Sequence, residues 1–272
     1  MYHYNQVIDH FPTNNSGHLC IVILISQYKM KVALITGANK GIGLEVARQL
    51  GQHGVKILIG ARNTEKGEKA SGSLRAIGVE AGFIHLDVTR EESIIAAARQ
   101  IREEYGKLDI LVNNAGVFPE YFQGLFDVTV VPQEVLAATF QTNVFGAILT
   151  IKHLLPLLKK APYANIVNVA STAGSITDQS DPASPFYSMR AIAYASSKAA
   201  LNMVTVQVAK QLAGTDVKIN SICPGWVRTD MGTEHAPRTV AQGASIIVKM
   251  ASLAKEDTTN GAFVDDLGII PW

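Results

Sequence analysis

The sequence predicts an α/β fold in which a parallel sheet carries helices on both of its faces. Short apolar runs alternate with amphipathic segments through the whole chain after Met30. Parallel strands need helical crossovers of this kind, because each strand must return to the same end of the sheet. A glycine-rich turn also follows the first apolar run directly. Ligands of such folds bind at the carboxyl ends of the strands, so functional residues are expected there.

Seven apolar runs account for the predicted strands in order. These runs span residues 32–35, 55–60, 82–86, 109–112, 165–170 and 217–222, and a short last one lies near 262–264. Between the runs, apolar residues recur at helical spacing, as Ile94, Ala98 and Ile101 do. Residues 117–131 and 174–193 lack this periodicity and predict long loops, which are usually functional inside a compact domain.

Composition narrows the class of protein. A chain of 272 residues with 47% hydrophobic content can bury a large core as one domain. Its net charge of +1 gives no reason to expect a nucleic acid or an anionic membrane as partner. The two cysteines, Cys20 and Cys223, form neither a disulfide framework nor a metal-binding spacing, and the histidines are scattered. We therefore predict no metal site and a cytoplasmic location.

The first 29 residues are polar and aromatic without a helical period. Their longest apolar run, 19–26, is far shorter than the roughly 18 residues that a membrane helix needs. It also lacks the basic leader and cleavage site of a signal peptide. Residues 1–29 are thus predicted to be an appendage that contributes nothing to the site, and 30–272 to be the functional domain.

The segment Thr36-Gly-Ala-Asn-Lys-Gly-Ile-Gly43 joins the first strand to a helix. A strand, a glycine turn and a helix place backbone N–H groups and a helix N-terminus against a phosphate. A simple tight turn is the alternative, but the preceding strand favours a dinucleotide site. The predicted cofactor contacts in this turn are Gly37, Asn39, Lys40, Gly41, Ile42 and Gly43.

The residue after the second strand selects the nucleotide. An acidic side chain there would hold the ribose hydroxyl of NAD, whereas arginine would accept the 2′-phosphate of NADP. The chain has Arg62 at this place and no acid, and Lys40 adds a second positive charge. Both could be ordinary solvated cations, but together they favour NADP.

Two further strand ends carry candidate cofactor contacts. Asp87 and Val88 follow the third strand, where Asp87 could cap the next helix or accept a hydrogen bond from an adenine amino group. Asn114 and Gly116 follow the fourth strand. They form either a simple turn or a backbone that packs closely against the cofactor.

Tyr194 and Lys198 lie four residues apart at the start of a helical run, and therefore on one helix face. A lysine ammonium at about 4 Å, at an effective dielectric near 20, would stabilise a phenolate by roughly 4 kcal/mol. The pKa of Tyr194 is therefore expected to fall by up to about three units. Ser171 follows the fifth strand, where substrate would lie, and a competing Tyr187 has no lysine at the matching position.

Asn143 lies inside an apolar helical pattern, close to Gly146. Both residue types are poor choices for a helix interior. The pattern indicates either a tolerated irregularity or a local distortion that frees a backbone carbonyl for a water or a proton relay.

Taken together, these motifs resemble the short-chain dehydrogenase/reductase family from Met30 to the C-terminus. The resemblance implies one Rossmann-type doubly wound domain with a seven-stranded parallel sheet. It implies a catalytic tetrad in which Tyr194 is the acid–base, Lys198 also holds the nicotinamide ribose, and Ser171 orients the carbonyl. Asn143 would hold a relay water. The segment that follows the sixth strand is similar to the family's nicotinamide loop, with Pro224, Gly225, Val227 and Thr229 as contacts.

The glycine turn, Arg62 and the C-terminal segment resemble the NADPH-dependent carbonyl reductase branch in particular. That implies reduction of a small ketone or aldehyde; a catalytically silent NADP-binding regulator on the same fold is the alternative. The chain between Ser171 and Tyr194 is longer than in the commonest members of the family, as it also is in carbonyl reductases. This resemblance implies a monomer or dimer rather than a tetramer. Residues 229–238 are a candidate lid, and the candidate pocket walls are Phe118, Tyr121, Phe122, Phe186, Trp226 and Met231.

Overall fold

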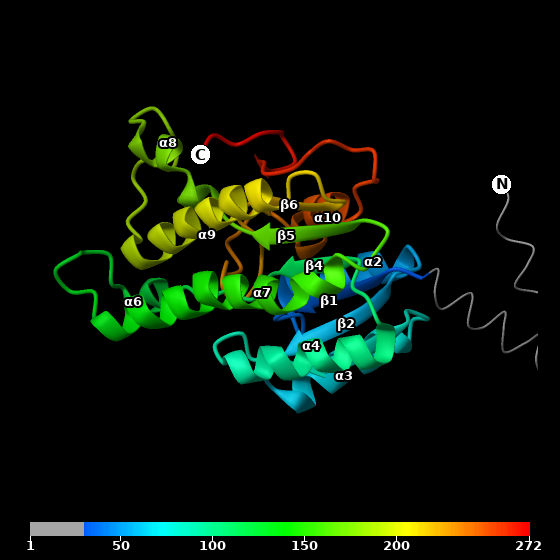
Figure 1. Ribbon diagram of the computed structural model, residues 1–272. Coiled ribbons are helices and arrows are strands. Elements are labelled where there is room, and N and C mark those ends of the chain that lie inside the picture. Colours follow the sequence, from blue (N-terminus) through cyan, green and yellow to red (C-terminus); the bar gives the residue numbers. More distant parts are fainter. Residues whose placement is uncertain (1–29) are drawn as a thin grey trace, which may run out of the picture.

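The computed structural model describes residues 30–272, so the predicted appendage 1–29 lies outside the described residues. Seven parallel strands form one sheet in the order β3-β2-β1-β4-β5-β6-β7 (Figure 1). The predicted fold class is confirmed. The strands are β1 (Val32–Thr36), β2 (Lys56–Ala61), β3 (Ala81–His85), β4 (Ile110–Asn113), β5 (Ala164–Val169), β6 (Val217–Ile222) and β7 (Phe263–Val264).

The central strands are buried on both faces, as the apolar runs predict. Every residue of β1, β4, β5 and β7 is buried. Ala33 of β1 pairs with Ile57 on one side and with Ile110 on the other. The strand order therefore reverses between β1 and β4, and the carboxyl ends of these two strands flank the crevice where this fold class binds ligands.

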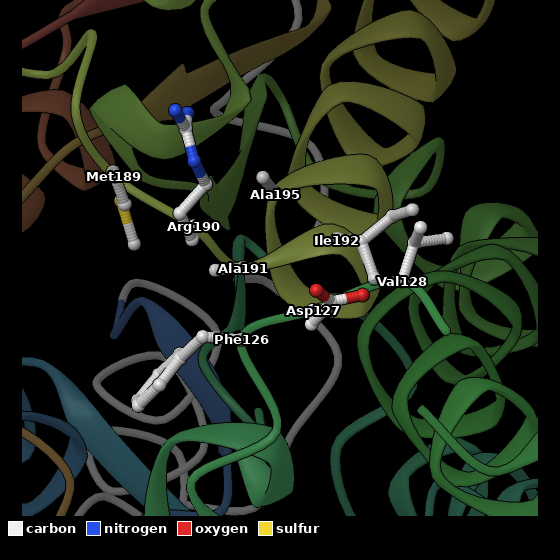
Figure 2. A pocket seen from close by; sticks show the side chains of 8 residues that line it. All are labelled: Phe126, Asp127, Val128, Met189, Arg190, Ala191, Ile192 and Ala195. Atoms are coloured by element: carbon white, nitrogen blue, oxygen red, sulfur yellow. The ribbon is translucent and has the colours of Figure 1, made fainter. Parts of the chain in front are cut away.

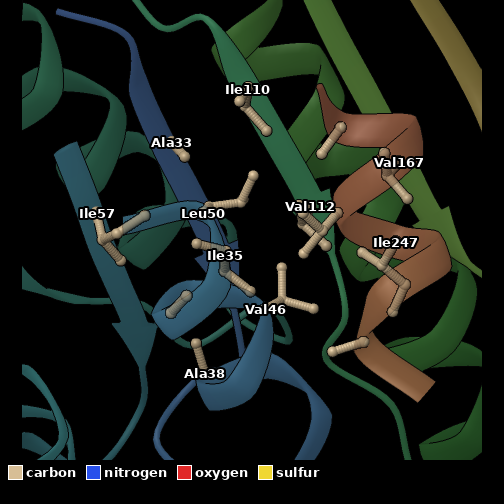
Figure 3. Close-up of a cluster of buried hydrophobic side chains, with 14 of the residues drawn as sticks. Ala33, Ile35, Ala38, Val46, Leu50, Ile57, Ile110, Val112, Val167 and Ile247 are labelled. Carbon is tan, nitrogen blue, oxygen red and sulfur yellow. The ribbon is translucent and has the colours of Figure 1, made fainter. Parts of the chain in front are cut away.

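Helices cover both faces of the sheet. The helices α2 (Gly41–Gln52), α3 (Thr64–Arg75) and α10 (Val240–Ala251) share one core with alternate strand residues such as Ala33 and Ile35 (Figure 3). The helices α4 (Glu91–Tyr105), α7 (Gly146–Leu158) and α9 (Ile192–Gln211) share the other core with Val32 and Leu34. Successive side chains of a strand point to opposite faces of the sheet, so each strand contributes residues to both cores.

The two predicted loops contain short helices. In the first, α5 (Pro119–Gln123) begins with proline and ends at the left-handed Gly124. The second begins at the last residue of the 3₁₀ turn η2 (Thr172–Gly174) and contains α8 (Ile176–Ser180), and α9 already begins at Ile192. The loop prediction was wrong for these stretches, since one-turn helices are too short to show a hydrophobic period.

A nearly continuous helical segment runs through α6 (Gln133–Phe140), the π-helical turn η1 (Gln141–Phe145) and α7. This stretch, Gln133–Leu158, is long and apolar enough to cross a membrane by length and composition. Ile151 and Leu154 of α7 pack in the core beneath the sheet. A core helix of this kind passes the same test.

Candidate functional site

The glycine turn after β1 needs glycine for two different reasons. Gly37 and Gly41 have φ angles of 64° and 58°, which side chains rarely adopt. Gly43 is constrained by space, because a Cβ there would lie 2.5 Å from the Asn114 amide nitrogen. The helix α2 starts directly after Lys40, which makes no side-chain cap, so its first N–H groups point into the turn. This cradle fits a phosphate.

The end of β4 holds the turn in place. The Thr36 hydroxyl accepts hydrogen bonds from the N–H groups of Asn114 and Ala115 at 3.0 and 2.9 Å. The Asn114 amide donates to the Thr36 carbonyl at 2.9 Å. The structure thus ties Asn114 to the cradle through protein contacts. Gly116 lies beside Lys198, since a Cβ there would be 3.7 Å from the Lys198 ammonium.

The predicted cations lie at the surface around this cradle. Lys40 forms an ion pair with Asp230 of the 229–238 segment, and this hydrogen bond holds the pKa of Asp230 below its usual value. Lys66 on α3 also acts on Asp230 electrostatically. Arg62 is exposed at the end of β2. Lys66 was not predicted from the sequence, yet it adds a third cation to the region.

Asp87 does not cap the next helix, whose N-cap residue is Arg90. Its carboxylate accepts hydrogen bonds from the Thr89 N–H and hydroxyl at 3.0 and 2.7 Å. Burial raises the pKa of Asp87, but the Thr89 donors, together with the charges of Arg62 and Arg90, bring it below its usual value. The capping alternative is therefore wrong, and Asp87 stays charged close to Arg62.

The segment after β6 lies over the cradle. Gly225 has a φ of 76°, and Val227 is buried and bridges to Arg238. The methyl group of Thr229 would lie 3.5 Å from a Cβ on Gly41, so this segment packs against the phosphate turn. Among the predicted contacts, Pro224 is buried and Val88 packs closely against Gly146.

Lys198 is buried on α9, and its ammonium donates to the Val169 carbonyl at 2.7 Å. Burial lowers its pKa to about 8. Its nitrogen lies 5.6 Å from the centre of the Tyr194 ring. The lysine is thus held by the carboxyl end of β5, next to the tyrosine that the sequence paired with it.

Burial raises the pKa of Tyr194 to about 12, and the Ser171 hydroxyl acts in the opposite direction. The expected depression of this pKa by Lys198 is therefore not found. The ammonium is engaged by the Val169 carbonyl, and the tyrosine ring is stacked on Phe118 at 4.1 Å between centroids. Removing the phenol from water disfavours the phenolate.

Ser171 is brought to the same place by close packing. It caps η2 by accepting the Ala173 N–H at 3.2 Å. A Cβ on Gly174 would lie 2.6 Å from the Lys198 carbonyl carbon, so the backbone after β5 touches α9 directly. Ser171, Tyr194 and Lys198 therefore meet at the carboxyl edge of the sheet, as predicted.

Asn143 lies in the π-helical turn η1, so the predicted distortion is present. Its side-chain oxygen accepts the Val117 N–H at 2.8 Å, and its amide donates to the Val117 carbonyl and to Ser197 Oγ, both at 3.0 Å. Ser197 in turn donates to the Tyr194 carbonyl at 2.7 Å. The Asn143 side chain thus links the loop after β4 to α9, the helix that carries Tyr194 and Lys198.

A cavity of about 420 Å³ opens beside the start of α9. Figure 2 shows the lining residues Phe126, Asp127 and Val128 of one segment, together with Ile192 and Ala195 from the start of α9. Its remaining lining residues are Met189, Arg190 and Ala191. None of the predicted wall residues lines this cavity. Two of them, Phe118 and Tyr121, contact each other with tilted rings whose centroids lie 5.4 Å apart.

Two buried polar residues of the site were not predicted. Glu120 accepts a hydrogen bond from the Tyr194 N–H at 2.8 Å, and Ser197 holds the Tyr194 carbonyl. In the sequence, Glu120 stands out only as a single acidic residue among the aromatic residues Phe118, Tyr121 and Phe122. Ser197 lies within the Tyr-x-x-x-Lys pattern itself.

The structure describes one of the two cysteines and the possible metal ligands of residues 30–272. Cys223 is a buried free thiol that accepts hydrogen bonds from the N–H groups of Thr172 and Gly225. Cys20 lies outside the described residues. Within residues 30–272, no three His, Cys, Asp or Glu side chains gather as a metal site would require.

Comparison with known proteins gives a consistent picture. Residues 31–240 match the family model described as short chain dehydrogenase. A short-chain dehydrogenase of Penicillium roqueforti, anuI, is 35% identical over 86% of this chain and 94% of its own length. The NADPH carbonyl reductase 1 of Sus scrofa is 32% identical over 89% of this chain and 94% of its own.

Solved structures agree with these sequence matches. The NADPH-bound carbonyl reductase from chicken fatty liver superposes with a TM-score of 0.78 at 28% identity, covering 89% of this chain and 99% of that one. Salutaridine reductase from Papaver somniferum superposes with a TM-score of 0.73 at 27% identity, covering 87% and 99%.

Proposed function

The chain belongs to the short-chain dehydrogenase/reductase family, and from that premise we propose that it is an NADPH-dependent reductase of ketones or aldehydes. The observation that carries the proposal is the meeting of Ser171, Tyr194 and Lys198 beside the glycine cradle. Relatives that are named NADPH carbonyl reductases, from pig and mouse, support the choice of cofactor and reaction.

The cofactor would lie across the carboxyl ends of β1 and β4. The pyrophosphate would face the cradle and the N-terminus of α2. Its 2′-phosphate would meet the cations Arg62, Lys40 and Lys66, and the end of β2 offers no carboxylate to repel it. Asn39 and Ile42 complete the turn, and Thr229 would close over it. When bound, NADPH supplies a hydride from its nicotinamide ring.

The protein residues provide the proton and the charge. A tyrosine with a pKa of about 12 keeps its proton at neutral pH, so Tyr194 is poised to protonate a carbonyl oxygen. Ser171 would orient that oxygen by a hydrogen bond. Lys198, with a pKa of about 8, is charged at pH 7 and would stabilise the phenolate left behind. Asn143 holds the catalytic helix and would support a relay water from η1.

The substrate is proposed to be an apolar or aromatic carbonyl compound. Phe118 covers the Tyr194 ring, and the cavity beside α9 carries Phe126, Ile192 and Met189. Such a lining favours apolar ligands. Arg190 and Asp127 line the same cavity and give it one charge of each sign.

Assembly and location complete the proposal. The stretch before α9, with α8, is tied to the C-terminus, since the Thr177 N–H donates to the Trp272 carbonyl at 2.9 Å. That long stretch supports a monomer or dimer rather than a tetramer. We place the activity in the cytoplasm. A silent NADP-binding regulator is less favoured, because Ser171, Tyr194 and Lys198 are all present.

The proposal is tested by cofactor preference. Purified protein is mixed with NADPH or NADH and a panel of ketones, aldehydes and quinones, and loss of nicotinamide absorbance is followed. We expect NADPH to be preferred, and Arg62→Ala to raise its KM about tenfold, in line with loss of a charge-assisted contact. Arg102→Ala, an exposed arginine at the end of α4, is the matched control. Preference for NADH, or an unchanged KM in Arg62→Ala, would contradict the cofactor assignment.

A further inference from the structure

The helix that carries both Tyr194 and Lys198 begins without a cap of its own. Its N-cap position is Ala191, which has no side-chain acceptor. By contrast, α3 is capped by Asn63 and α10 by Thr239. The first N–H groups of a helix have no partner within the helix, and an N-cap side chain normally takes those of the second and third positions. In α9 these positions are Ala193 and Tyr194.

Glu120 supplies the missing acceptor from a place 74 residues earlier in the chain. Its Oε2 accepts the Tyr194 N–H at 2.8 Å, and the Ala193 N–H also stabilises its charged form. The side chain is 0% exposed. Its other oxygen, Oε1, has no hydrogen-bond partner within residues 30–272. One carboxylate thus joins α5 to the first turn of the catalytic helix.

The same segment also contacts the Tyr194 ring. Phe118, two residues before Glu120, stacks on that ring at 4.1 Å. On the opposite side, Ser197 donates to the Tyr194 carbonyl and is itself held by Asn143. The backbone of Tyr194 is therefore fixed at its N–H by Glu120 and at its carbonyl by the network that leads to Asn143.

We propose that Glu120 is a positioning residue. By capping α9 from α5, it fixes the position of the Tyr194 hydroxyl in the site. Burying a carboxylate is unfavourable, and burial raises the pKa of Glu120 above its usual value. A serine or asparagine at position 191 would cap the helix without that cost. The buried acid instead couples the catalytic helix to α5 and its aromatic residues, which would contact substrate.

This inference rests on the proposed reductase function, and its test separates the two. Glu120→Ala should lower kcat by about tenfold or more, since small displacements of a catalytic group have effects of that size. The Kd for NADPH, measured by fluorescence titration, should not change. Glu120→Gln keeps an acceptor oxygen, so it should restore kcat to within about threefold of the wild type. Glu134→Ala, an acid in the first turn of α6, is the control.

Hydrogen–deuterium exchange gives a readout that does not depend on turnover. The first-turn amides of α9 should exchange faster in Glu120→Ala and remain protected in Glu120→Gln. If Glu120→Ala does not fold, Glu120→Asp takes its place, because its shorter side chain withdraws the acceptor. An inactive wild type would refute the reductase function. An active wild type with full kcat in Glu120→Ala, or equal impairment in Glu120→Gln, would refute the positioning role.

Discussion

Burial of Lys198 places a positive charge in the site and also lowers the stability of the folded protein. The ammonium is almost fully buried and has one carbonyl partner, Val169. Its pKa falls from 10.5 to about 8, because the charged form is poorly solvated. The same group that would stabilise a phenolate therefore destabilises the folded chain whenever it is charged.

The pH dependence of stability follows from that shift. The unfolded chain binds the Lys198 proton more tightly than the native protein between pH 8 and 10.5, so stability due to this group rises with pH across that window. Below pH 8 the full penalty, about 3 kcal/mol, is present. Lys198→Met removes the charge. Its stability advantage over the wild type should therefore be larger at pH 7 than at pH 10, as measured by urea unfolding.

The exposed Lys210 at the other end of α9 provides the control. Lys210→Met should show no such change between pH 7 and pH 10. If the free energy of unfolding of Lys198→Met differed from that of the wild type by the same amount at pH 7 and pH 10, burial would not destabilise the charged form of Lys198.

Tyr194 is the residue at which sequence reasoning was least accurate. Spacing correctly placed it on one helix face with Lys198, but spacing does not reveal where an ammonium points. The nitrogen is bonded to the Val169 carbonyl, and the phenol is covered by Phe118. Desolvation therefore outweighs the lysine's effect, and the pKa of Tyr194 rises to about 12. A tyrosine that keeps its proton at neutral pH could act as the acid in carbonyl reduction.

At the scale of elements, the contact between the turn after β5 and α9 brings Ser171 close to Tyr194 and Lys198. Gly174 lies against the backbone of α9. A Cβ on Gly174 would lie 2.6 Å from the carbonyl carbon of Lys198 and 2.8 Å from the backbone nitrogen of Ala199. A Cβ atom does not approach backbone atoms this closely, so any side chain at 174 must push the turn and the helix apart.

Gly174→Ala should therefore destabilise the protein by about 1–3 kcal/mol and lower kcat about tenfold or more. Thermal unfolding and steady-state rates measure these effects. Gly72→Ala is the matched control, because a Cβ there would meet only the Arg75 side chain at 3.7 Å, inside α3. Alanine should raise stability at that position by about 0.5–1 kcal/mol, through helix propensity. Equal behaviour of the two variants would contradict the close-packing account.

The strands and long helices could be predicted because their residues repeat with a clear period. The short helices α5 and α8 could not, since five residues span little more than one turn. The contacts of Glu120 were equally out of reach. A cap that acts over 74 residues leaves no local pattern, whereas the cap of α10 follows from Thr239 and Gln242 three residues apart.

At the scale of the whole molecule, sheet order explains why distant motifs form one site. The cradle follows β1, Arg62 follows β2, Asn114 follows β4, Ser171 follows β5 and Pro224 follows β6. All strands are parallel, so their carboxyl ends share one edge. Strand ends are readable in sequence, which is why most of the candidate site was predicted. The cavity was not, because most of its lining residues lie in two irregular segments, 126–128 and 189–191, and only Ile192 and Ala195 belong to a helix.

In the proposed reaction, a hydride passes from NADPH to a carbonyl carbon while Tyr194 protonates the oxygen. Transfer of isotope tests it most directly. The protein is incubated with a reducible ketone and NADPH deuterated at both C4 positions, and the alcohol is analysed by mass spectrometry. We predict deuterium on the carbinol carbon, and formation slowed at least about 100-fold in Tyr194→Phe. Unlabelled alcohol, or equal turnover by Tyr194→Phe, would contradict the account.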